Sequence, residues 1–449
     1  MHTAHPHLPA NSIASIWDEQ HFACLNKPHL RFSDITGPIT QFTEHSNVRH
    51  QVIGHACSGT PVTRLTVGEG PLVLLAWTQM HGDEPTATAA VLDWLHILLT
   101  QPLPSLDTNW QSLVTLHIIP MLNPDGAEQR TRVNAQGIDI NRDAKALQSP
   151  EGRILWEQVS LLKPDIAFNL HDQNPYYTAG NQGESATIAF LAPAFHVDKH
   201  VDAPRLRAKQ LIACMADAIK HWLPRHIGRY DDTYSLRSFG DNIAATGAST
   251  ILIESGAYPG DPNRQMARKM NVIALQTALE ALLSNQFMAK SLADYYSIPD
   301  NVEDGLVDIK FQQLALTCFN EQFHADISVN ICRKTGRASI KHIGDLSVQQ
   351  AFYNPNTVGM KVLPLVGEAL VAPLTLTRQD YLNKLSAGIV YFIGDQHYLN
   401  NQSGLPVLCV PEALTHHWLQ PDTAAYWIMQ HDNGHCVAVL NGELVSVES

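Results

Sequence analysis

Two residue types that ligate metals, a histidine and a glutamate, stand three positions apart at His81 and Glu84. They follow residues 71–80, a near-continuous apolar run typical of a strand buried on both faces. At this spacing an imidazole and a carboxylate can point the same way, and together they suit a zinc ion with an open coordination position. The pair arises often by chance, so alone it favours a solvated surface pair.

A third candidate ligand, His171, ends a separate predicted strand at residues 165–170. A single histidine after an apolar strand is more simply explained as a hydrogen-bonded core residue. Parallel strands, however, bring their carboxyl ends to one edge of a sheet, where α/β proteins bind ligands. Three such groups at one edge indicate a metal site formed by His81, Glu84 and His171.

Residues 123–143 form the most distinctive stretch, with three arginines and three asparagines among ordered Gly and Pro positions. Guanidinium groups near a zinc ion can clamp a carboxylate through paired hydrogen bonds and can stabilise an oxyanion. The alternative is a solvated loop whose arginines offset nearby acids. The stretch is therefore a candidate for substrate binding.

Another carboxylate, Glu254, directly follows the short apolar run 250–253. A carboxylate at the end of a buried strand is costly unless it faces a cleft or a cation. In isolation Glu254 is more simply a turn or helix-capping acid. Beside a zinc ion it would be placed to act as the general base on the metal-bound water.

An alternation of strands and helices carries these candidate residues. Apolar runs predict strands, and helical spacing predicts helices, at the following places: strands at 71–80, 113–122, 165–170 and 250–253, and helices at 86–100, 151–162, 204–222 and 262–285. This order predicts an α/β fold with a mixed, mostly parallel sheet and helices on both of its faces.

The ordered series of motifs resembles the zinc metallocarboxypeptidase family, the carboxypeptidase A-like group and its bacterial branch, over roughly residues 60–290. The matching motifs are HGDE (81–84), NPDG (123–126), RxNxxGIDINR (132–142), NLH (169–171) and IES (253–255). The resemblance implies a zinc carboxypeptidase-like fold and one zinc ion held by His81, Glu84 and His171. It also implies that Glu254 is the general acid/base.

The resemblance implies roles for further residues. Asp139 matches the carboxylate that orients the first zinc histidine. Asn141 and Arg142 match the pair that grips the substrate's terminal carboxylate, and Arg132 matches the arginine that polarises the scissile carbonyl. Tyr234 lies about where digestive members of the family carry a mobile tyrosine over the bound C-terminus, although a core or surface tyrosine is the simpler interpretation.

These roles imply a hydrolase that removes a C-terminal amino acid from a peptide, by attack of a zinc-bound water activated by Glu254. One alternative is an N-acyl-amino-acid deacylase of the aspartoacylase and succinylglutamate desuccinylase type with the same zinc site. Those deacylases generally lack the NPDG motif, which favours the peptidase. Either enzyme takes a substrate with a free carboxylate. A second alternative is a non-catalytic zinc- or ligand-binding module whose second domain carries the function.

The length of 449 residues exceeds what one compact core usually holds. The predicted catalytic domain comprises residues 1–297, with an N-terminal extension to about residue 45 to which no structure is assigned. Short Val- and Leu-rich runs at 362–377, 387–393, 406–410 and 436–447 predict a smaller β-rich domain over residues 298–449. Its role is left unassigned.

Charge and composition limit the partners. The chain has 30 Lys and Arg against 43 Asp and Glu, and its net charge of −13 argues against nucleic acid binding. Its apolar runs are far shorter than the roughly 20 residues that a membrane span needs, and the first ten residues lack a secretory signal pattern. Seven scattered cysteines suit reduced thiols. We expect a cytoplasmic protein without nucleic acid or membrane partners, and homo-oligomer formation stays open.

Overall fold

The computed structural model describes residues 8–103, 105–106, 108–181 and 184–447, so most of the N-terminal stretch considered for a secretory signal lies outside it. Contacts divide the chain into two compact units, Met1–Glu303 and Asp304–Ser449. The predicted boundary was between residues 297 and 298. Residues just beyond it form β10 (Asn301–Val302), which pairs with β6 (Thr178–Ala179) and thereby stays with the first unit.

The first unit is built on one eight-stranded mixed sheet. Its strands are β1 (Val48–His55), β2 (Pro61–Val67), β3 (Leu72–Thr78), β4 (Val114–Ile119), β5 (Ile166–Asp172), β7 (Ile188–Leu191), β8 (Ile227–Arg229) and β9 (Ser249–Ser255). Their spatial order is β1-β2-β4-β3-β5-β9-β7-β8. The pairs β3–β4, β3–β5, β5–β9 and β7–β8 are parallel, and the other three pairs are antiparallel. The predicted mixed, mostly parallel sheet is confirmed.

Helices precede and connect these strands. They are α1 (Leu8–Gln20), α2 (Phe32–Thr43), α3 (Thr86–Thr100), α4 (Pro124–Gln129), α5 (Pro150–Leu162), α6 (Ala203–Ile219), α7 (Phe239–Ala244), α8 (Gln265–Ser284) and α9 (Leu292–Tyr296), with 3₁₀ turns η1 (Ala23–Leu25), η2 (Trp110–Ser112), η3 (Ile140–Arg142) and η4 (Gln286–Ala289). Helices α1 and α2 occupy the N-terminal segment to which the sequence assigned no structure.

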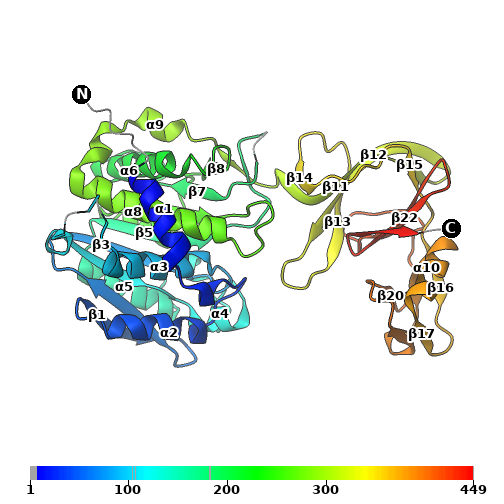
Figure 1. Cartoon of the computed structure of the whole chain (residues 1–449), viewed down its shortest axis with the longest axis horizontal. Coiled ribbons are helices and arrows are strands. Elements are labelled where there is room, and N and C mark those ends of the chain that lie inside the picture. Colours follow the sequence, from blue (N-terminus) through cyan, green and yellow to red (C-terminus); the bar gives the residue numbers. More distant parts are fainter. Residues whose placement is uncertain (1–7, 104, 107, 182–183, 448–449) are drawn as a thin grey trace. The chain divides into compact units, whose positions relative to one another are not determined.

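Alternating side chains of the central strands contribute to two separate cores. In β3, Leu74 and Ala76 belong to a cluster with residues of α3, α6 and α8. Leu75 and Trp77 belong to a second cluster with residues of α5 and α7. Because successive side chains of a strand point to opposite faces, a strand covered on both faces must be apolar throughout. Figure 1 shows the helices on both faces of this sheet.

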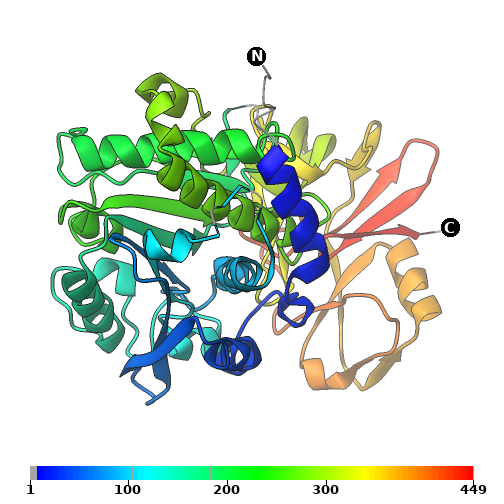
Figure 2. The same cartoon turned by 60° about the vertical axis from the view of Figure 1, so that its left-hand side comes forward.

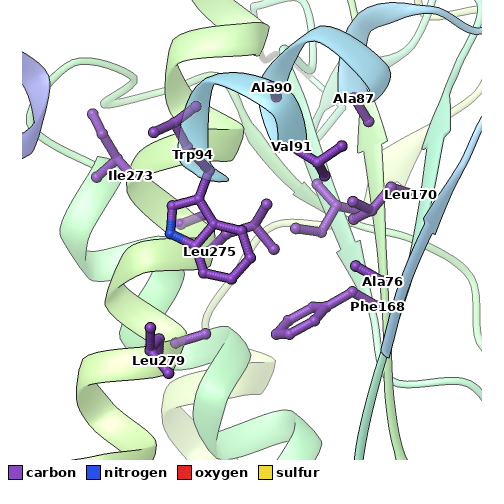
Figure 3. Close-up of a cluster of buried hydrophobic side chains, with 14 of the residues drawn as sticks. Ala76, Ala87, Ala90, Val91, Trp94, Phe168, Leu170, Ile273, Leu275 and Leu279 are labelled. Carbon is purple, nitrogen blue, oxygen red and sulfur yellow. The ribbon is translucent and has the colours of Figure 1, made fainter. Parts of the chain in front are cut away.

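One part of the first core joins α3, α8 and β5 (Figure 3). Trp94 of α3 packs in a cluster with Phe168 of β5 and Leu275 of α8, and all three side chains are fully buried. The indole Nε1 of Trp94 donates a hydrogen bond to Oε1 of Gln276 at 2.9 Å. This buried cluster supports β3 and β5 from one face of the sheet.

The second unit, coloured yellow to red in Figures 1 and 2, is β-rich. Its elements are β11 (Leu306–Cys318), β12 (Glu321–Ile331), β13 (Ala338–Gly344), β14 (Gln350–Tyr353), β15 (Met360–Val362), β16 (Val366–Ala369), β17 (Leu374–Leu376), α10 (Arg378–Ser386), β18 (Ile389–Ile393), η5 (Gln396–Tyr398), β19 (Leu399–Asn401), β20 (Leu408–Val410), β21 (Tyr426–His431), β22 (Cys436–Leu440) and β23 (Glu443–Val447). The larger sheet has the order β13-β12-β11-β15-β21-β22-β23, with β14 also pairing with β11. The predicted apolar run 362–377 is divided among β15, β16 and β17. Among the described residues, no helix combines the length and apolar character that a bilayer crossing requires.

Candidate active site

Three potential metal ligands meet beyond the ends of β3 and β5. His81 and Glu84 lie in the loop between β3 and α3, and His171 lies in β5. Each carboxylate oxygen of Glu84 lies within hydrogen-bond distance of one imidazole. Oε1 is 2.7 Å from Nδ1 of His81, and Oε2 is 2.8 Å from Nδ1 of His171. All three residues are buried, and their ligand atoms lie within 4.8 Å of one another. Because β3 and β5 are parallel neighbours, the topology brings these distant residues together.

The loop that carries His81 is pressed against the NPDG segment. A Cβ at Gly82 would lie 1.9 Å from the carbonyl carbon of Gly126, so only glycine fits at position 82. Asn123 caps α4 by accepting a hydrogen bond from the N–H of Gly126 at 2.8 Å. The same side chain donates to the carbonyl of Met80 at 3.1 Å. The NPDG motif therefore positions the loop between β3 and α3, which carries His81 and Glu84.

Asp139 connects the ligand set to the polar segment between α4 and α5, called the polar loop below. Its Oδ1 is 3.2 Å from Nε2 of His81, and its Oδ2 accepts a hydrogen bond from Nε of Arg132 at 2.9 Å. Arg132 also reaches Oε1 of Glu84 with NH1 at 3.5 Å. A carboxylate that accepts from Nε2 holds the proton on that nitrogen, so Nδ1, which faces Glu84, is the nitrogen that would ligate a metal. The predicted contact between Asp139 and His81 is thus present.

The electrostatics of the site favour a bound cation. Burial lowers the pKa of His81, but Glu84 and Asp139 outweigh burial and raise it to about 9. Burial alone would raise the pKa of Glu84, yet the two histidines hold it well below its usual range. These carboxylates thus stabilise positive charge at this point, which a divalent cation supplies more fully than a proton. Two imidazoles and one carboxylate also match the donor set of open catalytic zinc sites.

Glu254 lies on β9, directly beside the ligand strand. In the parallel register of β5 and β9 it is paired with His171. Its Oε2 is buried and has no hydrogen-bond partner among the described residues. Burial, and then the negative charge of Glu84, raise the pKa of Glu254 well above its usual value. A carboxylate with a raised pKa beside a metal site is suited to accept and return a proton during catalysis.

The predicted carboxylate-binding pair, Asn141 and Arg142, lies within η3. Asn141 is buried, and its Oδ1 accepts a hydrogen bond from the backbone N–H of Phe239 at 2.9 Å. Arg142 is exposed, and its NH1 donates to the backbone carbonyl of Asn141 at 2.8 Å. Among the described residues, neither side chain has a hydrogen bond to the three candidate ligands. Both follow Asp139 in the same short segment, and the exposed guanidinium of Arg142 remains accessible to a ligand.

The tyrosine prediction concerned Tyr234, which is half-buried between β8 and α7. The neighbouring Tyr230 has the clearer link to the site. Burial raises the pKa of Tyr230, and the charge of Glu254 raises it further, so its hydroxyl lies within electrostatic reach of Glu254. Its hydroxyl is also 3.2 Å from that of Tyr177. Tyr230 directly follows a strand, which is the signal that could have singled it out.

Sequence reasoning also missed a buried acid beside the ligands. Asp172 follows His171, and its Oδ2 accepts hydrogen bonds from the hydroxyl and the N–H of Thr86 at 2.7 and 3.3 Å. NH1 of Arg264 lies 3.5 Å from the same oxygen and donates to the carbonyl of Ser255 at 2.6 Å. Burial raises the pKa of Asp172 to about 6. The sequence carried one signal for Asp172, because this acid directly follows the NLH motif at 169–171.

Comparison with known proteins finds a similarity in the first unit. Residues 40–167 match the family model of zinc carboxypeptidases. This part of the chain is therefore similar to zinc carboxypeptidases. The matched range contains His81, Glu84 and the polar loop, and it ends before His171. The metal of this family is zinc, and His81, Glu84 and His171 form the candidate zinc-binding group of this chain.

Individual relatives cover parts of the chain. Carboxypeptidase SOL1 of Arabidopsis thaliana is 29% identical over 131 residues, which is 26% of this chain and 26% of that relative. A metallo-carboxypeptidase from Burkholderia cenocepacia is 18% identical with a TM-score of 0.45, over 57% of this chain and 70% of the other. A carboxypeptidase A from Helicoverpa armigera is 15% identical with a TM-score of 0.46, over 62% and 80%.

Proposed function

We propose that the chain is a zinc-dependent carboxypeptidase, which hydrolyses the bond before the C-terminal residue of a peptide. The observation that carries the proposal is the pairing of Glu254 with His171 across β9 and β5. It puts a carboxylate of raised pKa beside a group of three residues suited to zinc. Hydrolysis by an activated water requires this combination of metal ligands and a proton acceptor.

Each residue of the site has a defined task in this reaction. Zinc, when bound, supplies a Lewis acid that makes water more acidic and polarises the scissile carbonyl. Glu254 accepts the proton of the attacking water and later returns it to the leaving amine, so no net proton is gained or lost by the enzyme. Arg132 stabilises the negative charge that develops on the carbonyl oxygen, a contribution of about 3–4 kcal/mol for one such donor. Asp139 holds the guanidinium of Arg132 in place.

The polar loop restricts the reaction to chain ends. Arg142 presents an exposed guanidinium next to Asn141, and an arginine binds a carboxylate through paired, charge-assisted hydrogen bonds. With the substrate's terminal carboxylate bound there, only the last peptide bond reaches the metal. The substrate is therefore a peptide with a free C-terminus.

We also propose that the enzyme works in a reducing compartment such as the cytoplasm, because its seven cysteines are free thiols.

The test compares three substrate classes with the zinc-loaded full chain. These are N-blocked dipeptides with a free C-terminus, the same dipeptides with a C-terminal amide, and N-acetylated amino acids. We expect turnover of the free dipeptides to exceed that of both other classes, to be lost on chelation and to return with zinc.

Two outcomes would overturn the proposal. Preferred turnover of N-acetylated amino acids would identify a deacylase that uses the same site. A zinc-replete chain that is inert toward all three classes and toward cell-wall peptides would identify a non-catalytic binding module.

A further inference from the structure

A second group of metal-ligating residues lies outside the active site. It comprises Cys57 in the turn between β1 and β2, Asp125 in α4 and Glu151 in α5. One thiol or carboxylate atom from each of them lies within 4.8 Å of the others. None of these residues takes part in the hydrolysis proposed above. Three elements that are far apart in the sequence therefore direct acidic groups to a single point.

The two carboxylates of this group are buried without a positively charged side chain as a partner among the described residues. Glu151 is 0% and Asp125 5% exposed, and no ion pair among the described residues involves either of them. Asp125 accepts hydrogen bonds from the N–H and the hydroxyl of Ser58. Glu151 accepts one from Nδ2 of Asn134 at 2.8 Å through Oε2. Buried carboxylates are normally paired or bound to a metal because isolated burial is costly.

One oxygen of this group is left unsatisfied. Oε1 of Glu151 is buried and has no hydrogen-bond partner within the part of the chain that the structure describes. Burial raises the pKa of Glu151, and the nearby charge of Asp125 raises it further. The thiol of Cys57 has a raised pKa through burial and through these two acids. The raised pKa values of Glu151 and Cys57 show that negative charge is disfavoured on both groups, and a bound cation would relieve this.

We propose that Cys57, Asp125 and Glu151 bind a second divalent cation, of the zinc type. A thiolate ligand selects zinc, cadmium or cobalt over magnesium and calcium, which prefer oxygen ligands alone. Cys57 is exposed and leaves a route for the ion to enter and for water to complete its coordination. The predicted site is structural and separate from the candidate zinc group of His81, Glu84 and His171.

The position of the site assigns it a role in ordering the polar loop. Asp125 precedes the loop segment that carries Arg132 and Asp139, and Glu151 follows that segment. Asn134, within the segment, is bonded to Glu151. A cation held between Asp125 and Glu151 would fix both ends of the loop. We expect cation loss to destabilise this region without removing any residue from the active site.

Cobalt(II) spectroscopy tests the site without reference to activity. The active-site group contains no cysteine, so a thiolate-to-cobalt charge-transfer band in the near ultraviolet reports the second site alone. We expect the full-length chain to show this band, and Cys57→Ser to lose it. Cys24→Ser removes another exposed thiol of the same unit and should keep the band.

Further variants separate the second site from other metal binding. Zinc stoichiometry alone is insufficient, because His196, Asp198 and His200 form an exposed cluster that can also take zinc. His171→Ala should keep the charge-transfer band, so failure of the proposed active site leaves this test intact. Absence of the band in the full-length chain, or its persistence in Cys57→Ser, would overturn the proposal. Circular dichroism of Cys57→Ser controls for folding.

Discussion

Thr86 donates a hydrogen bond from its hydroxyl to Oδ2 of Asp172 at 2.7 Å, and this bond joins the two segments that carry the candidate zinc ligands. Thr86 begins α3, two residues after Glu84, and Asp172 directly follows His171. The backbone N–H of Asp172 also donates to Oε2 of Glu84 at 3.1 Å. The separation between Glu84 and His171 therefore depends on contacts that lie behind the ligands.

Removal of the Thr86 hydroxyl should weaken zinc binding. Thr86→Val keeps the shape of the side chain but leaves the buried Asp172 without its shortest hydrogen bond. Loss of such a supporting contact typically lowers metal affinity by about 10–100-fold. Competition with a chromogenic chelator measures the change, and Thr86→Ser, which retains the hydroxyl, should bind zinc as the parent does. Equal affinities for the two variants would show that the bond has no positioning role.

Replacement of Glu254 should separate zinc binding from turnover. Glu254→Gln removes the proton acceptor but alters none of the three zinc ligands, so zinc content should be unchanged. We expect kcat to fall about 10²–10⁴-fold, the usual contribution of a general acid/base. Glu157→Gln, at an exposed position of α5, is the matched control and should keep full activity. Normal kinetics in Glu254→Gln would refute the catalytic role.

The central strands could be predicted because their sequences are apolar on both faces. Residues 71–80 and 113–122 contain β3 and β4, and the predicted strand 165–170 overlaps β5. Their parallel order then placed His81, Glu84 and His171 at one edge. The alternation of strands and helices brought these residues to one edge, and the resemblance of the HGDE and NLH motifs implied that they are the ligand group.

The N-terminal helices could not be predicted, because their partners lie far away in the chain. Nε1 of Trp17 in α1 donates to Oδ2 of Asp93 at 2.8 Å, across 76 positions. Arg268 donates to the same carboxylate at 2.7 Å from 175 positions away. A local window of sequence contains none of these contacts, and α1 has no acidic residue in its first turn to mark its start.

Polar support of the site was hidden for a related reason. Nothing local in the sequence linked Asp172 to Thr86, 86 positions away, until the fold brought them together. Likewise, polar residues interrupt the long strands β11 and β12, so these strands lack the continuous apolar runs that marked the central strands of the first unit. Residue type predicts chemistry, whereas a supporting role depends on tertiary contacts.

Loss of the exposed guanidinium at Arg142 should affect substrates according to their C-terminus. Arg142→Ala should raise KM for dipeptides with a free carboxylate by about 10–100-fold, which corresponds to one charge-assisted hydrogen-bonded contact. Amidated dipeptides should be turned over at the parental rate. Arg225→Ala, an exposed arginine outside the polar loop, serves as the control. A similar change for both substrate types would contradict carboxylate recognition by Arg142.

The stability of the first unit should fall in acid through His117. This buried histidine on β4 has its Nδ1 2.8 Å from the hydroxyl of Thr66. Burial, and then the charges of Arg64 and Arg49, lower its pKa to about 4. In the unfolded chain an imidazole titrates near pH 6.5, so between about pH 6.5 and 4 only the unfolded state gains the proton. The free energy of unfolding should therefore drop across this range by up to about 3 kcal/mol.

The variant His117→Asn tests this effect, because it keeps a polar group near Thr66 but cannot take up the proton. Urea denaturation followed by tryptophan fluorescence at several pH values gives the free energy of unfolding. The parent should lose more stability than the variant between about pH 6.5 and 4, since other titrating groups, including those of the zinc site, are common to both proteins. His50→Asn, at an exposed position of β1, should behave as the parent. Parallel pH profiles for the parent and His117→Asn would mean that His117 is protonated alike in the folded and unfolded states.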